Sequence, residues 1–211
     1  MTNYQKLYDG ILKAAWGYFF IYFNININTV SLIPSFVGYL LFLSAIEHLK
    51  DEERELSLLH TLGVILVGWH SVAWLASWFS FNLDGAWQFI DIIISLVNLY
   101  FHFQLLTNLA SIATKYQPEG YEQDAKLLRY RTLQTIMLTS ILIITRLHPW
   151  LSEVWTYVSV ILLITRLQPW LSEVWTYISM VMLIVYLIAG ICLMKALFEL
   201  RRCLPTNEEQ I

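Results

Sequence analysis

Three long stretches without charged residues constrain the fold of this chain more than any other feature. Residues 14–46, 61–83 and 92–114 contain no Asp, Glu, Lys or Arg. Only 14% of the chain is charged, against roughly 25% in soluble domains. A soluble domain of 211 residues could not bury several uncharged runs of this length. Because a helix needs about 20 mostly apolar residues to cross a bilayer, the runs predict membrane-spanning helices.

The apolar segments and their connections form a regular pattern. Six segments are clear, at about residues 11–27, 32–49, 57–81, 86–112, 127–147 and 172–198. The loops at 47–55 and 113–131 contain several Lys and Arg residues, whereas 24–31 and 80–86 contain none. Cytoplasmic loops carry the excess of basic residues, so the N-terminus and the two basic loops are expected on the cytoplasmic side.

A tandem repeat joins the last two segments. Residues 141–160 and 161–180 differ at four positions, where Ile143, His148, Val158 and Val160 are replaced by Leu163, Gln168, Ile178 and Met180. We interpret the repeat as a tandem duplication of 20 residues. Each copy holds the end of one helix, a Pro-Trp-Leu turn and the start of the next helix. Copying it therefore creates a hybrid helix at residues 151–167.

The path of this hybrid helix stays open at this point. Its length matches a hydrocarbon core of about 30 Å, and tryptophans lie near its two ends, as in an interfacial belt. However, a crossing would move the basic residues of the C-terminal segment to the outside, against the charge pattern. We predict an all-α, polytopic transmembrane helix bundle, a single domain over residues 1–211, with seven membrane-embedded helices. The side on which the C-terminus lies is not determined.

The fourth segment carries polar and ionisable residues on one helical stripe. Asp91, Ser95, Asn98 and His102 are spaced by four, three and four positions. His70, in the third segment, is the nearest candidate partner. Such residues are costly inside a bilayer and usually face the bundle interior or a wet cavity. Two interpretations remain: a pathway for a proton, an ion or a small solute, or hydrogen bonds that hold the helices together.

Several functional classes find no support in the sequence. It contains no P-loop and no GxGxxG, HExxH or GxSxG motif, so an enzyme is not favoured. The net charge of −3 provides no footprint for nucleic acid. Cys192 and Cys203 form no CxxC pair, and we predict neither a metal site nor a cofactor.

The second segment contains a recognisable run, IPSFVGY, which begins at Ile33 and ends at Tyr39. It resembles an (L/I)-P-x-F-(I/V)-G-Y pattern in small polytopic bacterial membrane proteins of unassigned activity. The resemblance implies a location in the bacterial cytoplasmic membrane and implies no chemistry. Pro34 is expected at the start of the helix, and Gly38 is expected to let a neighbouring helix approach closely.

Together these observations predict a small transport-related or solute-sensing membrane component. The alternative is a non-catalytic scaffold or assembly partner that docks on another membrane protein. The expected partners are the lipid bilayer and, for the alternative, that second membrane protein. The sequence identifies neither a substrate nor an oligomeric state.

Overall fold

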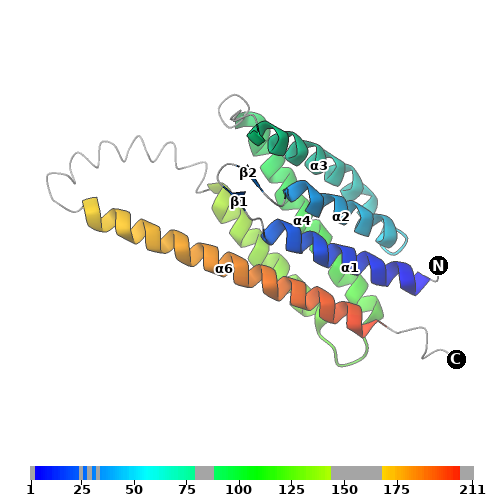
Figure 1. The fold of residues 1–211 in the computed structure, drawn as a ribbon. Coiled ribbons are helices and arrows are strands. Elements are labelled where there is room, and N and C mark those ends of the chain that lie inside the picture. The colour runs from blue at the N-terminus through cyan, green and yellow to red at the C-terminus, as the bar shows by residue number, and fades with distance from the viewer. Residues whose placement is uncertain are drawn as a thin grey trace.

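The computed structural model describes residues 3–23, 26–27, 30–31, 34–78, 88–143 and 168–204, and this part of the chain is almost entirely helical. The helices are α1 (Asn3–Tyr22), α2 (Ser35–Leu49), α3 (Leu56–Trp78), α4 (Gln88–Tyr116) and α6 (Gln168–Cys203), with a further helical segment at residues 123–143. Between α1 and α2, β1 (Asn26–Ile27) pairs antiparallel with β2 (Val30–Ser31). The helices form a bundle (Figure 1), which confirms the predicted helical class.

Within the part of the chain that the structure describes, three helices are long and apolar enough to cross a membrane: Leu56–Trp78, Phe89–Tyr116 and Leu183–Cys203. α2 has 15 residues and so covers about 22 Å, less than a core of about 30 Å. α1 begins at Asn3 and therefore includes polar residues that precede the predicted apolar segment. Seven membrane-embedded helices are thus not confirmed, and the hybrid helix at 151–167 lies outside the described residues.

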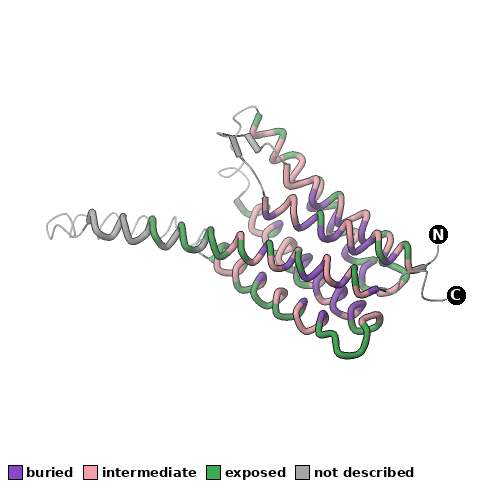
Figure 2. Tube along the Cα trace, turned by 60° about the horizontal axis from the view of Figure 1, so that its bottom comes forward, coloured by how far each residue is buried: buried purple, intermediate pink, exposed green. Residues whose placement is uncertain are grey.

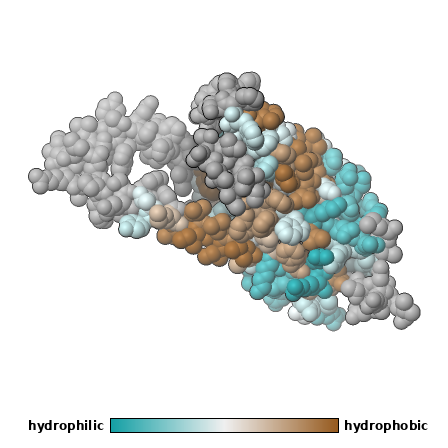
Figure 3. Space-filling model, in the orientation of Figure 1, coloured by the Kyte–Doolittle hydropathy of each residue, from teal (hydrophilic) through white to brown (hydrophobic). Residues whose placement is uncertain are grey.

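Successive helices run in opposite directions, so the basic connections meet at one end of the bundle. α1 begins and α6 ends at this end (Figure 1), and Figure 3 shows hydrophilic residues gathered there beside a hydrophobic middle. Three ion pairs define what we call the charged end: Lys6–Asp51 at 3.6 Å, Lys115–Glu53 at 2.8 Å and Lys126–Glu199 at 3.2 Å. These pairs connect α1, α4 and α6 to the neighbouring loop and helical segment.

Glu53, in the connection between α2 and α3, is the acceptor of a small network at the charged end. Its Oε1 lies 2.8 Å from Nζ of Lys115 and accepts a hydrogen bond of 2.6 Å from Oγ of Ser111. The bonds from Lys115 and Ser111 hold the pKa of the Glu53 carboxyl below its ordinary value. The network therefore fixes the α2–α3 connection against the end of α4.

α1 and α2 meet at a contact between two glycines. A Cβ atom on Gly38 would lie 2.9 Å from the carbonyl oxygen of Gly17 and 2.8 Å from Cγ1 of Ile21. A Cβ on Gly17 would lie 3.0 Å from the carbonyl oxygen of Gly38. The two backbones can approach this closely because neither glycine has a side chain. The close approach expected at Gly38 is confirmed, and α2 begins directly after Pro34.

α6 is a helix of 36 residues, about 54 Å long. It starts at Gln168, earlier than the predicted residue 172, because Pro169 is tolerated in a first helical turn where its missing N–H is not needed. Its C-terminal half packs on α1, whereas its N-terminal half projects from the bundle (Figure 2). Apolar side chains of the projecting half are exposed, among them Tyr177, Val181 and Leu183.

Candidate functional site

His102 lies in the interior of the bundle, inside a cage of aromatic rings. Its side chain comes from α4 and is only 2% exposed. The ring centroids of Tyr18, Phe101, Phe42 and Tyr39 lie 5.5, 5.6, 5.7 and 6.0 Å from that of His102. Its Nδ1 is 3.4 Å from the hydroxyl of Tyr18, which is a long hydrogen bond. α1 and α2 thus enclose the deepest residue of the predicted stripe.

Tyr39 of α2 connects the two histidines that the sequence singled out. Its ring stacks on that of His70 at 4.7 Å, with an interplanar angle of 13°, and lies 6.0 Å from that of His102. Its hydroxyl donates a hydrogen bond of 2.6 Å to Oδ1 of Asn98. Tyr39 therefore joins side chains of α3 and α4 through a single ring.

His70 and Asp91 form the edge of this arrangement. Nε2 of His70 is buried and has no hydrogen-bond partner among the described residues. Asp91, in the first turn of α4, interacts electrostatically with His70. A buried polar nitrogen without a partner is destabilising, so its presence calls for a physical or functional explanation.

The side chain of Ser95 bonds to the backbone of its own helix and not to another side chain of the predicted site. Its hydroxyl donates a hydrogen bond of 2.7 Å to the carbonyl oxygen of Asp91, one turn earlier in the same helix. A serine that bonds to its own helix has its donor already occupied. We define the histidine–tyrosine cluster as the remaining predicted residues together with the two tyrosines that connect them: Tyr18, Tyr39, His70, Asn98 and His102, with Asp91 at its edge.

The aromatic contacts continue from the cluster to α6. The ring of Tyr18 lies 6.2 Å from that of Tyr22, which lies 4.6 Å from that of Tyr186. Sequence analysis missed all the tyrosines of this row as site residues. One signal was present: Tyr18 and Tyr39 each directly follow a glycine, Gly17 or Gly38, and both glycines lie at the α1–α2 contact.

The groups in the cluster are proton donors and acceptors. Imidazole can accept a proton on one nitrogen while it donates from the other, and a phenol hydroxyl can do both. The Tyr39 hydroxyl donates to Asn98, so a transfer between the histidines would require this hydroxyl to turn away from the amide. Within the described ranges, no three His, Cys, Asp or Glu residues are grouped to hold a metal ion.

The sequence matches no protein-family model, and no curated protein or solved structure is significantly similar to it. The resemblance of the run from Ile33 to Tyr39 to small bacterial membrane proteins stays a prediction. The histidine–tyrosine cluster is therefore the main guide to function.

Proposed function

We propose that this protein is a multi-pass protein of the bacterial cytoplasmic membrane, a small transport-related or solute-sensing component whose cluster transfers or senses protons. One observation carries the proposal. His70 and His102, from different helices, are brought to the same buried tyrosine, and Asp91 lies beside the first of them. Ionisable groups in a membrane bundle usually mark a pathway for protons or ions.

The expected sequence of events follows from the contacts. Asp91 exchanges a proton with His70, whose Nε2 is free to accept it. Tyr39 then turns its hydroxyl away from Asn98, gives its own proton to His102 and takes in exchange the proton that His70 has accepted. A charged imidazole inside an apolar cage is costly, although aromatic faces offset part of that cost. Protonation of His102 therefore favours a looser packing of α1, α2 and α4.

The test uses purified protein in proteoliposomes with a pH-sensitive dye inside. We expect proton flux in response to a pH gradient, with His70→Gln and His102→Gln reducing it to the level of empty liposomes. His60→Gln is the matched control, because His60 is partly exposed near the charged end and lies 3.9 Å from Glu47. A sensing role predicts instead a pH-dependent change in tryptophan fluorescence that His102→Gln removes. The proposal is wrong if neither signal exists, or if both variants behave like His60→Gln.

We further propose that both chain ends lie on the cytoplasmic side and that the chain crosses the membrane an even number of times. The segment 123–143 runs antiparallel to α4, since Nη1 of Arg131 donates to Oγ1 of Thr107 at 3.1 Å. α6 then returns to the charged end, where Glu199 binds Lys126. These contacts favour six crossings over the predicted seven. They also imply that the segment 123–143 ends, and α6 begins, on the outer side.

Reporter fusions test this topology. Fusions after Pro118 and after Leu204 should report the same, cytoplasmic side, and a fusion after Gln168 should report the outer side. A C-terminal reporter on the outer side would restore seven crossings and contradict the proposal.

The scaffold alternative is favoured by a separate observation. Apolar side chains of the projecting half of α6 are exposed to between 47% and 67%, as in Val185 and Tyr177. A second membrane protein could cover them. In that case, replacing Asp91 by Asn together with His102 by Gln would leave partner binding intact, whereas charged substitutions on this half of α6 would abolish it.

A further inference from the structure

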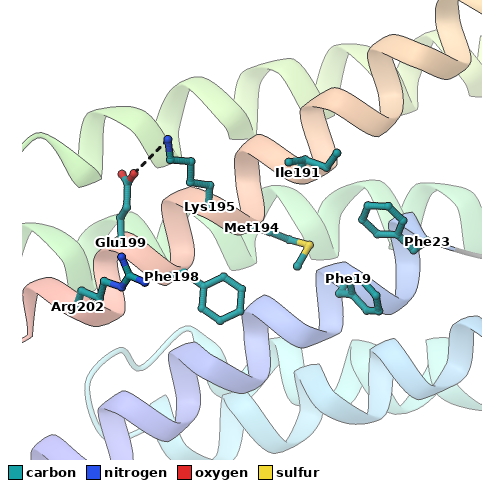
Figure 4. Close-up of a pocket in the computed structure, with 8 residues that line it drawn as sticks. All are labelled: Phe19, Phe23, Ile191, Met194, Lys195, Phe198, Glu199 and Arg202. Atoms are coloured by element: carbon teal, nitrogen blue, oxygen red, sulfur yellow. Dashed lines mark ion pairs between the residues drawn. The ribbon is translucent and has the colours of Figure 1, made fainter.

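A groove runs between α1 and the C-terminal half of α6. Its volume is about 420 Å³, and Figure 4 shows the side chains that line it. From one end to the other, α6 contributes Ile191, Met194, Lys195, Phe198, Glu199 and Arg202, and α1 contributes Phe19 and Phe23. None of these residues belongs to the histidine–tyrosine cluster.

The groove is apolar over most of its length. Phe19 and Phe23 stack on each other at 4.9 Å on the α1 side, and Met194 lies opposite them in Figure 4. The distance along α6 from Ile191 to Arg202 is about 16 Å, at 1.5 Å per residue. This length, which includes the basic residues Lys195 and Arg202, is about half of a hydrocarbon core of about 30 Å.

The end of the groove near the charged end is basic. Lys195 is 77% exposed, lies 3.8 Å from Glu199, and has Arg202 as its basic neighbour along the groove. Glu199 is also bound from the other side by Lys126 at 3.2 Å. Two lysines therefore pair with one carboxylate, and Arg202 adds a further basic group, so this end of the groove carries a net positive charge.

We propose that this α1–α6 groove binds one anionic phospholipid of the cytoplasmic leaflet. An acyl chain lies along Phe19, Phe23 and Met194, and the phosphate is held by Lys195 and Arg202. The occupant follows from the order of chemistry along the groove: apolar side chains at the end near Ile191 and Phe23, then cationic side chains at the level of the headgroups. Basic pockets between membrane helices on the cytoplasmic side favour acidic headgroups in this way. The inference depends on the membrane location of α6 and not on proton transfer by the cluster.

Native mass spectrometry of the full chain in an uncharged detergent provides the test. The probes are phosphatidylglycerol and phosphatidylcholine with identical acyl chains. We expect one retained phosphatidylglycerol and much weaker retention of phosphatidylcholine. Lys195→Gln with Arg202→Gln should weaken the binding of phosphatidylglycerol on the order of 30-fold, since each basic group near an anionic surface contributes roughly fivefold.

Two further variants make the result decisive. Arg54→Gln with Arg129→Gln removes the same charge from exposed positions outside the groove, so it should retain the lipid. Ile191→Trp fills the groove without changing charge and should release the lipid; Ile191 is 52% exposed, so the protein tolerates the larger ring. Equal losses in the two charge variants would overturn the proposal. So would full retention in Ile191→Trp, or displacement of the lipid by inorganic phosphate, which would indicate a site for free anions.

Discussion

Replacing Gly38 by alanine should destabilise the protein, although alanine is the better helix former. A Cβ at this position would lie 2.9 Å from the carbonyl oxygen of Gly17 and 2.8 Å from Cγ1 of Ile21. Both distances are shorter than real Cβ contacts, and the oxygen belongs to a helical backbone that cannot rotate away. α1 and α2 must therefore separate by several tenths of an ångström.

The magnitude is the difference between two opposing effects. Overpacking at a tight contact costs about 1–3 kcal/mol. The change from glycine to alanine in a helix returns about 0.5–1 kcal/mol. The two ranges leave a net loss of up to about 2.5 kcal/mol, and about 1 kcal/mol from their midpoints. For a chain of this size, each kcal/mol lowers the melting temperature by roughly 2–4 °C. Gly38→Val, which adds further atoms at the same contact, should lose more.

Gly68 offers a matched control in α3. A Cβ there would meet nothing within 4 Å, so Gly68→Ala should raise the melting temperature or leave it unchanged. The assay is thermal unfolding of the purified protein in detergent, with each variant compared with the parent chain. If Gly38→Ala and Gly68→Ala shift the melting temperature equally, the close contact between α1 and α2 does not exist as described.

Three other perturbations follow from individual contacts. The bonds from Lys115 and Ser111 lower the pKa of Glu53, so they stabilise the fold above the ordinary carboxyl pKa, and this stabilisation is lost as the pH falls through the lowered pKa. Glu53→Gln should therefore flatten the acid side of a profile of stability against pH. An unchanged profile would contradict this prediction. Tyr39→Phe removes the hydrogen-bond donor to Asn98 and should lower the free energy of unfolding, measured with denaturant, by about 0.5–1.5 kcal/mol. The control Tyr177→Phe, at an exposed position, should change this free energy by less than about 0.5 kcal/mol. Gly190→Ala would place a Cβ 2.5 Å from the ring of Tyr22, so it should loosen α6 from α1. The looser helix should be cleaved faster by a protease near the C-terminus. Cleavage at the rate of the parent chain would contradict the contact.

Much of the helical layout could be predicted from the sequence because apolar periodicity and charge placement are local properties. α3 was expected at 57–81 and found at Leu56–Trp78, and α4 was expected at 86–112 and found at Gln88–Tyr116. The first helix was predicted too far along the chain. Hydropathy identifies only the apolar part of a helix, so it omits the polar residues at the start of α1, which begins at Asn3. Polar residues of this kind form helix readily outside the apolar core.

The part of the candidate site that lies on one helix could be predicted, whereas the part that depends on packing between helices could not. The spacing of Asn98 and His102 places them on one face of a single helix, which a sequence reveals. Their partners Tyr18 and Tyr39 come from α1 and α2, and only the packing of those helices brings them to His102. Spacing also suggested Ser95 as a member, but the hydroxyl bonds to its own helix, an alternative that periodicity cannot distinguish.

The contact between Gly17 and Gly38 lies directly beside two tyrosines of the histidine–tyrosine cluster. Tyr18 follows Gly17 and Tyr39 follows Gly38, so the close approach of the two backbones determines where both rings stand around His102. A change that separates α1 from α2 at this point must therefore move both tyrosines away from the histidine. Gly10 provides the contrast, because a Cβ there would meet the buried side chain of Leu49 at the end of α2, about two turns along α1 from Gly17. If the cluster transfers or senses protons as proposed, Gly38→Ala should lose stability and this activity together, whereas Gly10→Ala should alter stability alone.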